Sequence, residues 1–478
     1  METSRRSYRR ALQNCRRIVS VLIRSKMARV AEPIDRRRFI RRGSGSVGNR
    51  PSPLFAPAPT WLESLLFLTL MAGPPKFSGE REVTASLAGE IDLMVMIHTA
   101  VWASGALWVI TRLCSSALRR GVLPALNPVQ ITAWLLIGAL SLSLPESPGV
   151  LLTAFTVGQY GVMLSFAWLF VHRFGASAYL RHLFVGVSLL AVMIAVAAFV
   201  APDLVFAEGR LRGDKLADTG EVTALGLVFC LSNVPSLRSR TSWGMIFLFG
   251  VLLAMSQTRA AYVAVLVSLA IIYIYGKGLP ARKLVPLLAT LSVGLLLLDA
   301  LSPVTRYMIR ETGSLETMSD RIPLWQFLTA VVMRESPWTG LGYYSASRVW
   351  APEYNPALGN AHSAFFEILL GGGIIAATVY VGLCALLLWY AGRLLSVAGR
   401  QPEVIAGVGF LAVTLLLGIT SVAVHVGPSG FTFWSLPALL PAMWRQYARA
   451  PTSGHQRVPV RRSALRAQVG VHSRSVLS

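Results

Sequence analysis

The chain has 478 residues, of which 54% are hydrophobic and only 14% charged, and its mean hydropathy is +0.56. Soluble domains carry about 25% charged residues, so this composition excludes an ordinary soluble protein and indicates an integral membrane protein. The net charge of +23 lies mainly at the two ends: residues 1–50 hold 15 Lys and Arg, and residues 445–478 hold 7. Basic tails beside membrane spans are typical of cytoplasmic ends near anionic lipid, so they do not indicate nucleic-acid binding.

These tails bound the predicted domains. Residues 1–56 and 447–478 are predicted to be disordered basic tails in the cytoplasm, and residues 57–446 a transmembrane domain. The first fifty residues lack the apolar core and small-residue cleavage site of a secretory signal. The four cysteines have no paired spacing, so neither a disulfide nor a metal site is expected.

Apolar stretches predict an all-α fold with about 12 transmembrane helices, because a spanning helix needs about 20 mostly apolar residues. The predicted helices continue to the start of the C-terminal tail. They lie at about 57–73, 91–111, 124–144, 149–171, 182–201, 221–235, 240–256, 259–276, 283–301, 363–391, 404–426 and 430–445.

The distribution of Lys and Arg over the connecting loops predicts the orientation. If the N-terminal tail is cytoplasmic, every predicted inner loop carries basic residues, from Arg112 in the first to Arg400 in the last. This agrees with the positive-inside rule and leaves both termini in the cytoplasm. The long loop at 302–362 is then extracytoplasmic. Within it, apolar residues at helical spacing between Asp320 and Glu335 predict an amphipathic helix along the membrane surface.

Arginines at the starts of predicted outer helices are the candidate anion-binding residues. Arg259 begins a predicted span and Arg321 begins the loop helix, where a helix dipole favours a bound anion. Arg210 and Arg212 lie in the other large outer loop. Guanidinium groups can hold the two phosphates of a lipid diphosphate without a metal. Alternatively, Arg259 contacts lipid head groups at the membrane surface, and Arg210 and Arg212 are ordinary solvated loop arginines.

His362 is the candidate catalytic residue, because a histidine can accept a proton from an attacking hydroxyl at neutral pH. It lies where the chain enters the predicted span at 363–391, so a role in capping that helix is the alternative. Glu367 follows inside the apolar stretch, where an ionisable residue indicates function; it can orient the histidine or bind sugar hydroxyls.

The sequence lacks the motifs of several enzyme classes. The sequence has no Asp-x-Asp motif for a nucleotide-sugar metal, no phosphate-binding GxxxxGK[ST] loop, no HExxH helix and no GxSxG elbow. A reaction without metal or cofactor, in which a phosphate group leaves, is therefore predicted.

Three segments of the second half resemble the superfamily of bacterial O-antigen ligases and O-antigen or exopolysaccharide polymerases. The chain shares with it an arginine at a span start, Arg-x-x-x-Trp and Pro-x-x-Gly-x-Gly in the long loop, and a histidine before a glycine-ended helix. The matching segments are SQTRAAYVAVLV at 256–267, DRIPLWQFLTAVVMRESPWTGLGYYS at 320–345 and NAHSAFFEILLGGGIIAATVYV at 360–381.

This resemblance implies a multi-pass protein of the bacterial inner membrane that transfers a glycan, with inversion, from an undecaprenyl diphosphate carrier to a sugar hydroxyl. The acceptor would be lipid A core or a growing polysaccharide, and the site would be extracytoplasmic. Arg259 and Arg321 would hold the diphosphate, together with Arg210 or Arg212, and His362 would activate the acceptor. Ser363 stands where the family usually has asparagine, so ligase and polymerase both remain open. A transporter or flippase for an anionic lipid-linked glycan is the alternative from another class.

Overall fold

The computed structural model describes the parts of the chain that form the helical bundle and the second half of the long loop. Four predicted parts lie outside the described residues: the N-terminal tail, the C-terminal tail from residue 449 onward, the span at 283–301 and residues 302–320 of the long loop. Residues 447 and 448 of the predicted C-terminal tail are helical. The described ranges are 58–73, 93–120, 125–202, 205–207, 210–211, 217–232, 234, 239–256, 258–276, 321–356, 358–421 and 428–448.

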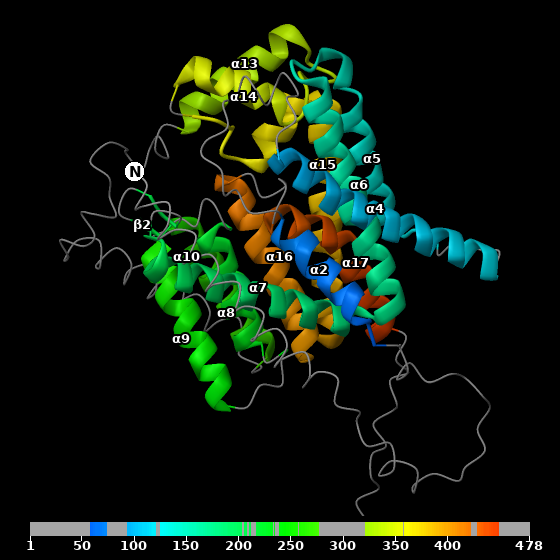
Figure 1. Ribbon diagram of the computed structural model, residues 1–478, viewed down its shortest axis with the longest axis vertical. Coiled ribbons are helices and arrows are strands. Elements are labelled where there is room, and N and C mark those ends of the chain that lie inside the picture. Colours follow the sequence, from blue (N-terminus) through cyan, green and yellow to red (C-terminus); the bar gives the residue numbers. More distant parts are fainter. Residues whose placement is uncertain are drawn as a thin grey trace, which may run out of the picture.

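Helices dominate these ranges (Figure 1), which confirms the predicted all-α class; the described strands are two residues long each and form one antiparallel pair. In chain order the elements are α2 Trp61–Ala72, α4 Leu93–Arg120, α5 Pro128–Ser141, η3 Leu144–Glu146, α6 Val150–Phe174, α7 Ala176–Val200, β1 Phe206–Ala207, β2 Arg210–Leu211, α8 Thr219–Leu231, α9 Ser239–Ser256, α10 Arg259–Ile271, η5 Ile272–Gly276, α13 Arg321–Glu335, α14 Ser345–Tyr354, α15 Ala364–Ala398, α16 Pro402–Thr420 and α17 Pro428–Ala448.

Six helical segments among the described residues are long and apolar enough to cross a membrane. Three shorter apolar helices accompany them, at Trp61–Ala72, Thr219–Leu231 and Thr241–Ser256. Each predicted span within the described residues overlaps a helix, whereas the total of twelve stays a prediction. The six segments are Pro128–Glu146, Val150–Phe174, Ala176–Val200, Arg259–Gly276, Ala364–Ala398 and Pro402–Thr420.

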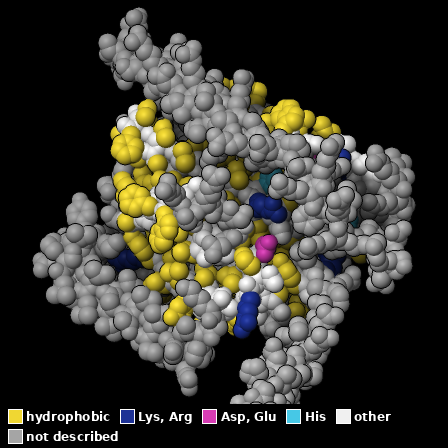
Figure 2. Space-filling model, turned by 90° about the horizontal axis from the view of Figure 1, so that it is seen from below, with side chains coloured by type: hydrophobic (Ala, Val, Ile, Leu, Met, Phe, Trp, Pro, Cys, Tyr) yellow, Lys and Arg dark blue, Asp and Glu magenta, His cyan; other side chains and the backbone are white. Residues whose placement is uncertain are grey.

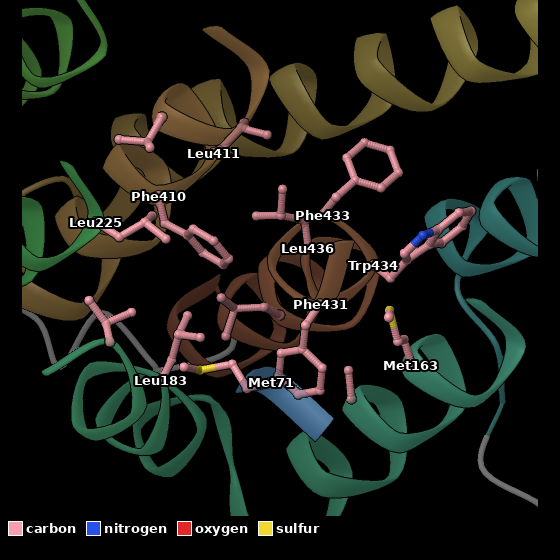
Figure 3. Packing of buried hydrophobic residues seen from close by; sticks show 14 of the residues in the cluster. Met71, Met163, Leu183, Leu225, Phe410, Leu411, Phe431, Phe433, Trp434 and Leu436 are labelled. Atoms are coloured by element: carbon pink, nitrogen blue, oxygen red, sulfur yellow. The ribbon is translucent and has the colours of Figure 1, made fainter. Parts of the chain in front are cut away.

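Helix α17 lies at the centre of the main hydrophobic core (Figure 3). Its side chains point outward in several directions, and the helix packs against α6, α7, α15 and α16. Trp434 is fully buried and stacks on Tyr160 of α6, with 4.9 Å between ring centroids. A helix that is apolar all round must be buried on every side, which explains why α17 holds the bundle together.

Helices α8, α10 and α16 pack together at Gly409. The start of α8, the start of α10 and the end of α16 lie at the same level of the bundle. Ser268 of α10 donates to the Gly409 carbonyl (3.3 Å), and Val228 of α8 packs on the same glycine. Gly276 lies against Ile405, so α10 and α16 run antiparallel. At about 1.5 Å of rise per residue, the start of α8, the start of α10 and the end of α16 each lie about 14 to 17 Å from Gly409. We call this level the α13 end of the bundle, because α13 binds the end of α16 there.

Helices α13 and α14 form a layer over the bundle, at the top of Figure 1. The loop between them docks on α15 through backbone hydrogen bonds: Leu341 N–H donates to the Leu370 carbonyl (2.9 Å), and Ile374 N–H donates to the Pro337 carbonyl (2.8 Å). Helix α15 opens for this contact at Gly373, whose φ of 65° interrupts the helix. A Cβ at Gly340 (φ 74°) would lie 2.5 Å from the backbone nitrogen of Gly373, so only glycine fits.

Hydroxyl groups join this layer to the turn between α5 and α6. The hydroxyls of Ser147, Thr153 and Ser345 are mutually hydrogen-bonded at 2.7 to 2.8 Å, and Thr153 also donates to the Tyr343 carbonyl (2.9 Å). All of these groups are buried, so each needs its partner. The start of α14 is therefore fixed to the membrane bundle by polar contacts as well as by the docked loop.

The outer surface fits a lipid environment. Large apolar side chains are exposed on several helices, for example Phe199 at 90% and Phe247 at 74%. Figure 2 looks from below at the end of the molecule opposite α13 and α14. Hydrophobic side chains cover much of the described surface there, and Lys and Arg side chains stand among them. Apolar surface of this extent is unusual for a soluble monomer and normal for a protein embedded in lipid.

Candidate functional site

Arg259 is the first residue of α10, as its sequence predicts. Thr258 before it has an extended backbone, and Gly220 at the start of α8 packs directly on the Thr258 side chain. A Cβ at Gly220 would come within 2.7 Å of Thr258, so the two helix starts are in close contact. The Arg259 side chain is exposed. Two positive helix-dipole ends and one guanidinium group are thus adjacent, an arrangement that attracts an anion.

A buried carboxylate reinforces this junction. Glu221, in the first turn of α8, is only 3% exposed and accepts a hydrogen bond from Thr432 of α17 (3.0 Å). Asp218 caps the same helix by accepting from the Glu221 N–H (3.1 Å). The start of α17 is therefore held beside the starts of α8 and α10.

Arg321 is the first residue of α13, and its guanidinium group binds the end of α16. Its Nη1 donates to the Thr420 carbonyl at 2.8 Å, a favourable contact because a helix C-terminus carries partial negative charge. Burial lowers the pKa of Arg321 from its ordinary value, although an arginine stays charged at neutral pH. This contact occupies one of the five N–H donors of the guanidinium group.

His362 lies in a short loop whose backbone is held from several sides. Its own N–H donates to the Asn360 side chain (2.8 Å). At the preceding residue, Ala361, the carbonyl accepts from Trp325 Nε1 (2.8 Å) and the N–H donates to Glu367 Oε2 (3.2 Å). His362 has a φ of 51°, a left-handed conformation that non-glycine residues rarely adopt. Such a conformation persists where neighbouring contacts determine it, and it is frequent at functional sites.

A chain of contacts connects the three predicted residues. Arg321 binds the end of α16, which lies at the level where Arg259 begins α10. Trp325 is one helical turn after Arg321 on the same face of α13, and it binds the residue before His362. The structure therefore brings Arg259, Arg321 and His362 to the same α13 end of the bundle.

Glu367 is 1% exposed and uses both carboxylate oxygens within the protein. Oε1 accepts from the Ser347 hydroxyl (2.6 Å) and Oε2 from the Ala361 N–H. The carboxylate thereby connects α14 to the loop of His362. Glu367 therefore holds the backbone of the histidine loop, and both roles predicted for it stay predictions.

The predicted arginines of the other outer loop are only partly described. The backbone of Arg210 pairs with Ala207 in the short strand pair, and β2 lies beside the end of α9 nearer α13 (Figure 1). Arg212 lies outside the described residues, and a role in binding stays a prediction for both. Among the described residues, no three His, Cys, Asp or Glu side chains come together in a metal-binding group. The need for a metal or cofactor is not decided by that observation.

Sequence reasoning missed how the histidine loop is supported. Trp325 was predicted only as an apolar residue of the loop helix, whereas its indole N–H fixes Ala361 and its ring stacks on Phe366, with 4.7 Å between centroids. The Arg-x-x-x-Trp spacing was the available signal, because it places Trp325 on the face of Arg321. Ser347 carried no signal, since a serine in a polar loop is common.

A surface pocket lies at the opposite end of the bundle, away from these residues. Residues of η5, the end of α15 and the turn after it line the pocket, with Tyr275 and Arg400 among them. It contacts none of the candidate site residues, so it adds nothing to the site.

The fold and the polar residues at the α13 end define a membrane-embedded protein with a candidate anion site beside a histidine. Residues 244–381, from α9 to the first half of α15, match the family model described as O-antigen ligase. This segment includes Arg259, Arg321 and His362. The match confirms the resemblance to the O-antigen ligase and polymerase superfamily. No curated protein matches the chain.

The family match and the apolar helices together support a bacterial integral membrane protein with a role in surface polysaccharide synthesis. Members of this family are glycosyltransferase-like ligases and polymerases, so the match supports an enzyme. It does not favour the transporter alternative.

Proposed function

We propose that this protein transfers a glycan from an undecaprenyl diphosphate carrier to a sugar hydroxyl at the extracytoplasmic face of the bacterial inner membrane. The family match supports the reaction class. The basic tails and inner loops support termini in the cytoplasm and, with them, an extracytoplasmic α13 end. Arg259 and Arg321 hold the diphosphate, with Arg210 or Arg212 as a further contact, and His362 is the catalytic base.

The proposed chemistry needs one displacement at the anomeric carbon. The bond from that carbon to the diphosphate oxygen breaks, and its electron pair leaves with the diphosphate. The acceptor oxygen forms the new bond from the opposite face, which inverts the configuration, and its proton passes to the His362 imidazole. Guanidinium groups and helix starts stabilise the charge that develops on the leaving phosphate. No metal is required in this scheme.

One observation carries the proposal. A histidine with a left-handed backbone and two arginines at helix starts lie at the same end of the bundle. A flippase would need a path through the membrane for its substrate, whereas these groups gather at one end of the helices.

Reconstituted transfer tests the proposal. The purified full-length protein in lipid nanodiscs would be given lipid-linked glycan and acceptor extracted from the host, and the products would be separated on a gel. Glycan that moves from the lipid to the acceptor is the expected result. Lipid-linked glycan that stays intact with active, folded protein would contradict the proposal.

Deletion of the gene separates the two reactions that remain open. If the protein is a polymerase, the deletion strain has no long chains on its surface. If it is a ligase, the deletion strain still makes long chains, which stay on their lipid carrier. Normal surface glycan in the deletion strain would contradict both reactions.

A further inference from the structure

Arg348, in the first turn of α14, is a half-buried arginine that the proposed reaction does not yet use. Its guanidinium carbon lies 4.1 Å from the centroid of the Tyr344 ring, and its Nη2 donates to the Tyr344 hydroxyl. Its Nε is buried and has no hydrogen-bond partner in the part of the chain that the structure describes. Tyr344 itself has a φ of 68°, a second left-handed residue in this layer. The planar guanidinium group of Arg348 thus packs on the Tyr344 ring, and its Nε–H donor has no partner among the described residues.

Arg348 and His362 are positioned by the same carboxylate. Glu367 accepts from Ser347, the residue before Arg348, and from Ala361, the residue before His362. Both oxygens of Glu367 are already engaged, and no ion pair between Arg348 and Glu367 occurs among the described residues. Burial lowers the pKa of Arg348 from its ordinary value, the nearby Glu367 carboxylate acts in the opposite direction, and an arginine stays charged at neutral pH. Arg348 therefore keeps donors for a ligand beside the histidine.

In the proposed displacement, the leaving diphosphate and the attacking acceptor lie on opposite sides of the anomeric carbon, so Arg348 can be assigned to one of the two. If the proposed function holds, the diphosphate leaves toward Arg259 and Arg321, and the acceptor approaches from the side of His362. Because the Glu367 carboxylate holds both the residue before Arg348 and the residue before His362, Arg348 is then on the acceptor side and not on the carrier side. We propose that Arg348, supported by the Tyr344 ring, binds a negatively charged group, a carboxylate or a phosphate, on the acceptor glycan. Planar guanidinium groups suit both oxyanions because they can donate two parallel hydrogen bonds.

Kinetics of Arg348→Gln tests this inference against a matched arginine of the same layer. Arg334 is 69% exposed and pairs with its neighbour Glu335 (2.7 Å), so Arg334→Gln is the control. Loss of a charge-assisted contact raises the KM for the acceptor by about 10- to 100-fold and leaves the KM for the lipid donor unchanged. Arg348→Lys keeps a positive charge near Glu367 but loses the planar guanidinium group. We expect its thermal stability to match that of the wild type and its acceptor affinity to lie between those of the wild type and Arg348→Gln. A loss of thermal stability in Arg348→Gln with equal increases in the KM values for donor and acceptor would show a purely structural role.

Chemically altered acceptors identify the oxyanion. One sample has its carboxylates reduced to alcohols, and a second has its phosphates removed. The wild type loses affinity for one of the two samples, whereas Arg348→Gln treats that sample and the untreated acceptor alike. Equal sensitivity of both proteins, a wild type indifferent to both treatments, or a raised donor KM would overturn the inference while transfer itself persists. Absence of transfer by the wild type would instead overturn the proposed function.

Discussion

The two sides of the candidate site are built differently. On the histidine side, the loop at 359–363 is held by side chains: Trp325, Asn360 and Glu367 each bind a backbone group next to or at His362. On the arginine side, Arg259 has an exposed side chain, and its position follows from the packing of helix starts, with Gly220 pressed against Thr258. The histidine loop thus depends on side-chain hydrogen bonds, whereas the position of Arg259 depends on the packing of helix starts.

This difference fits the task proposed for each side. A catalytic base must be placed accurately, because small displacements reduce proton transfer strongly. A guanidinium group that binds a phosphate acts over a longer range and can adjust its long side chain. The comparison therefore predicts that small changes matter on the histidine side, whereas only loss of charge matters at Arg259.

The largest expected effect is that of His362→Ala. Removal of a general base lowers kcat by about 10²- to 10⁴-fold. Donor binding and thermal stability stay near wild type, because the imidazole is not part of the diphosphate contacts. Single-turnover transfer measures the rate, and equilibrium binding of undecaprenyl diphosphate measures the affinity. A variant with normal kcat would remove His362 from the mechanism.

The next effect concerns the docked loop that supports the histidine side. Gly340→Ala places a Cβ 2.5 Å from the backbone nitrogens of Gly372 and Gly373 at a φ of 74°, so we expect it to destabilise the protein by about 3 kcal/mol. Gly359→Ala is the control, since a Cβ there meets nothing within 4 Å. Thermal unfolding and protease sensitivity of α13 and α14 measure the difference. Equal stability of the two variants would show that the loop is not docked as described.

The two arginines should differ from each other. Arg259→Gln weakens undecaprenyl diphosphate binding by about 10- to 100-fold with little change in the melting temperature, because contacts of an exposed arginine contribute little to stability. Arg321→Gln weakens binding similarly but also lowers the melting temperature, since Arg321 holds the Thr420 carbonyl at the end of α16. The same melting temperature for both variants would contradict the structural role of Arg321.

The smallest expected effect is that of Trp325→Phe. The ring still stacks on Phe366, but the hydrogen bond to the Ala361 carbonyl is lost, at a cost of about 1 kcal/mol. We expect kcat to fall about fivefold and donor affinity to stay constant. A change in donor affinity alone would mean that Trp325 belongs to the arginine side.

Much of the helical framework follows from the sequence. In a membrane, the backbone N–H and C=O groups of a long apolar stretch find hydrogen-bond partners within the stretch only if it forms a helix. The start of α10 at Arg259 and the helix at Arg321–Glu335 were predicted at these positions. The kink of α15 at Gly373 was not predicted, because it depends on the loop at 337–342, which is distant in the chain and pairs with the open helix.

The site residues followed from residue type and place, whereas their supports did not. Arg259, Arg321 and His362 were conspicuous as polar residues at the ends of apolar helices. Arg348 was indistinguishable from a solvated loop arginine, because its burial depends on the position of Tyr344. Such contacts arise only when α13, α14 and α15 pack together, and no spacing in the sequence encodes them.

The most direct test of the central claim is the structure of the protein in lipid nanodiscs with undecaprenyl diphosphate bound. We predict density for the diphosphate at the α13 end, in hydrogen-bonding contact with Arg259 and Arg321, and with its terminal phosphate on the side of His362. A diphosphate bound at the opposite end of the bundle, or in contact with neither arginine, would contradict the account.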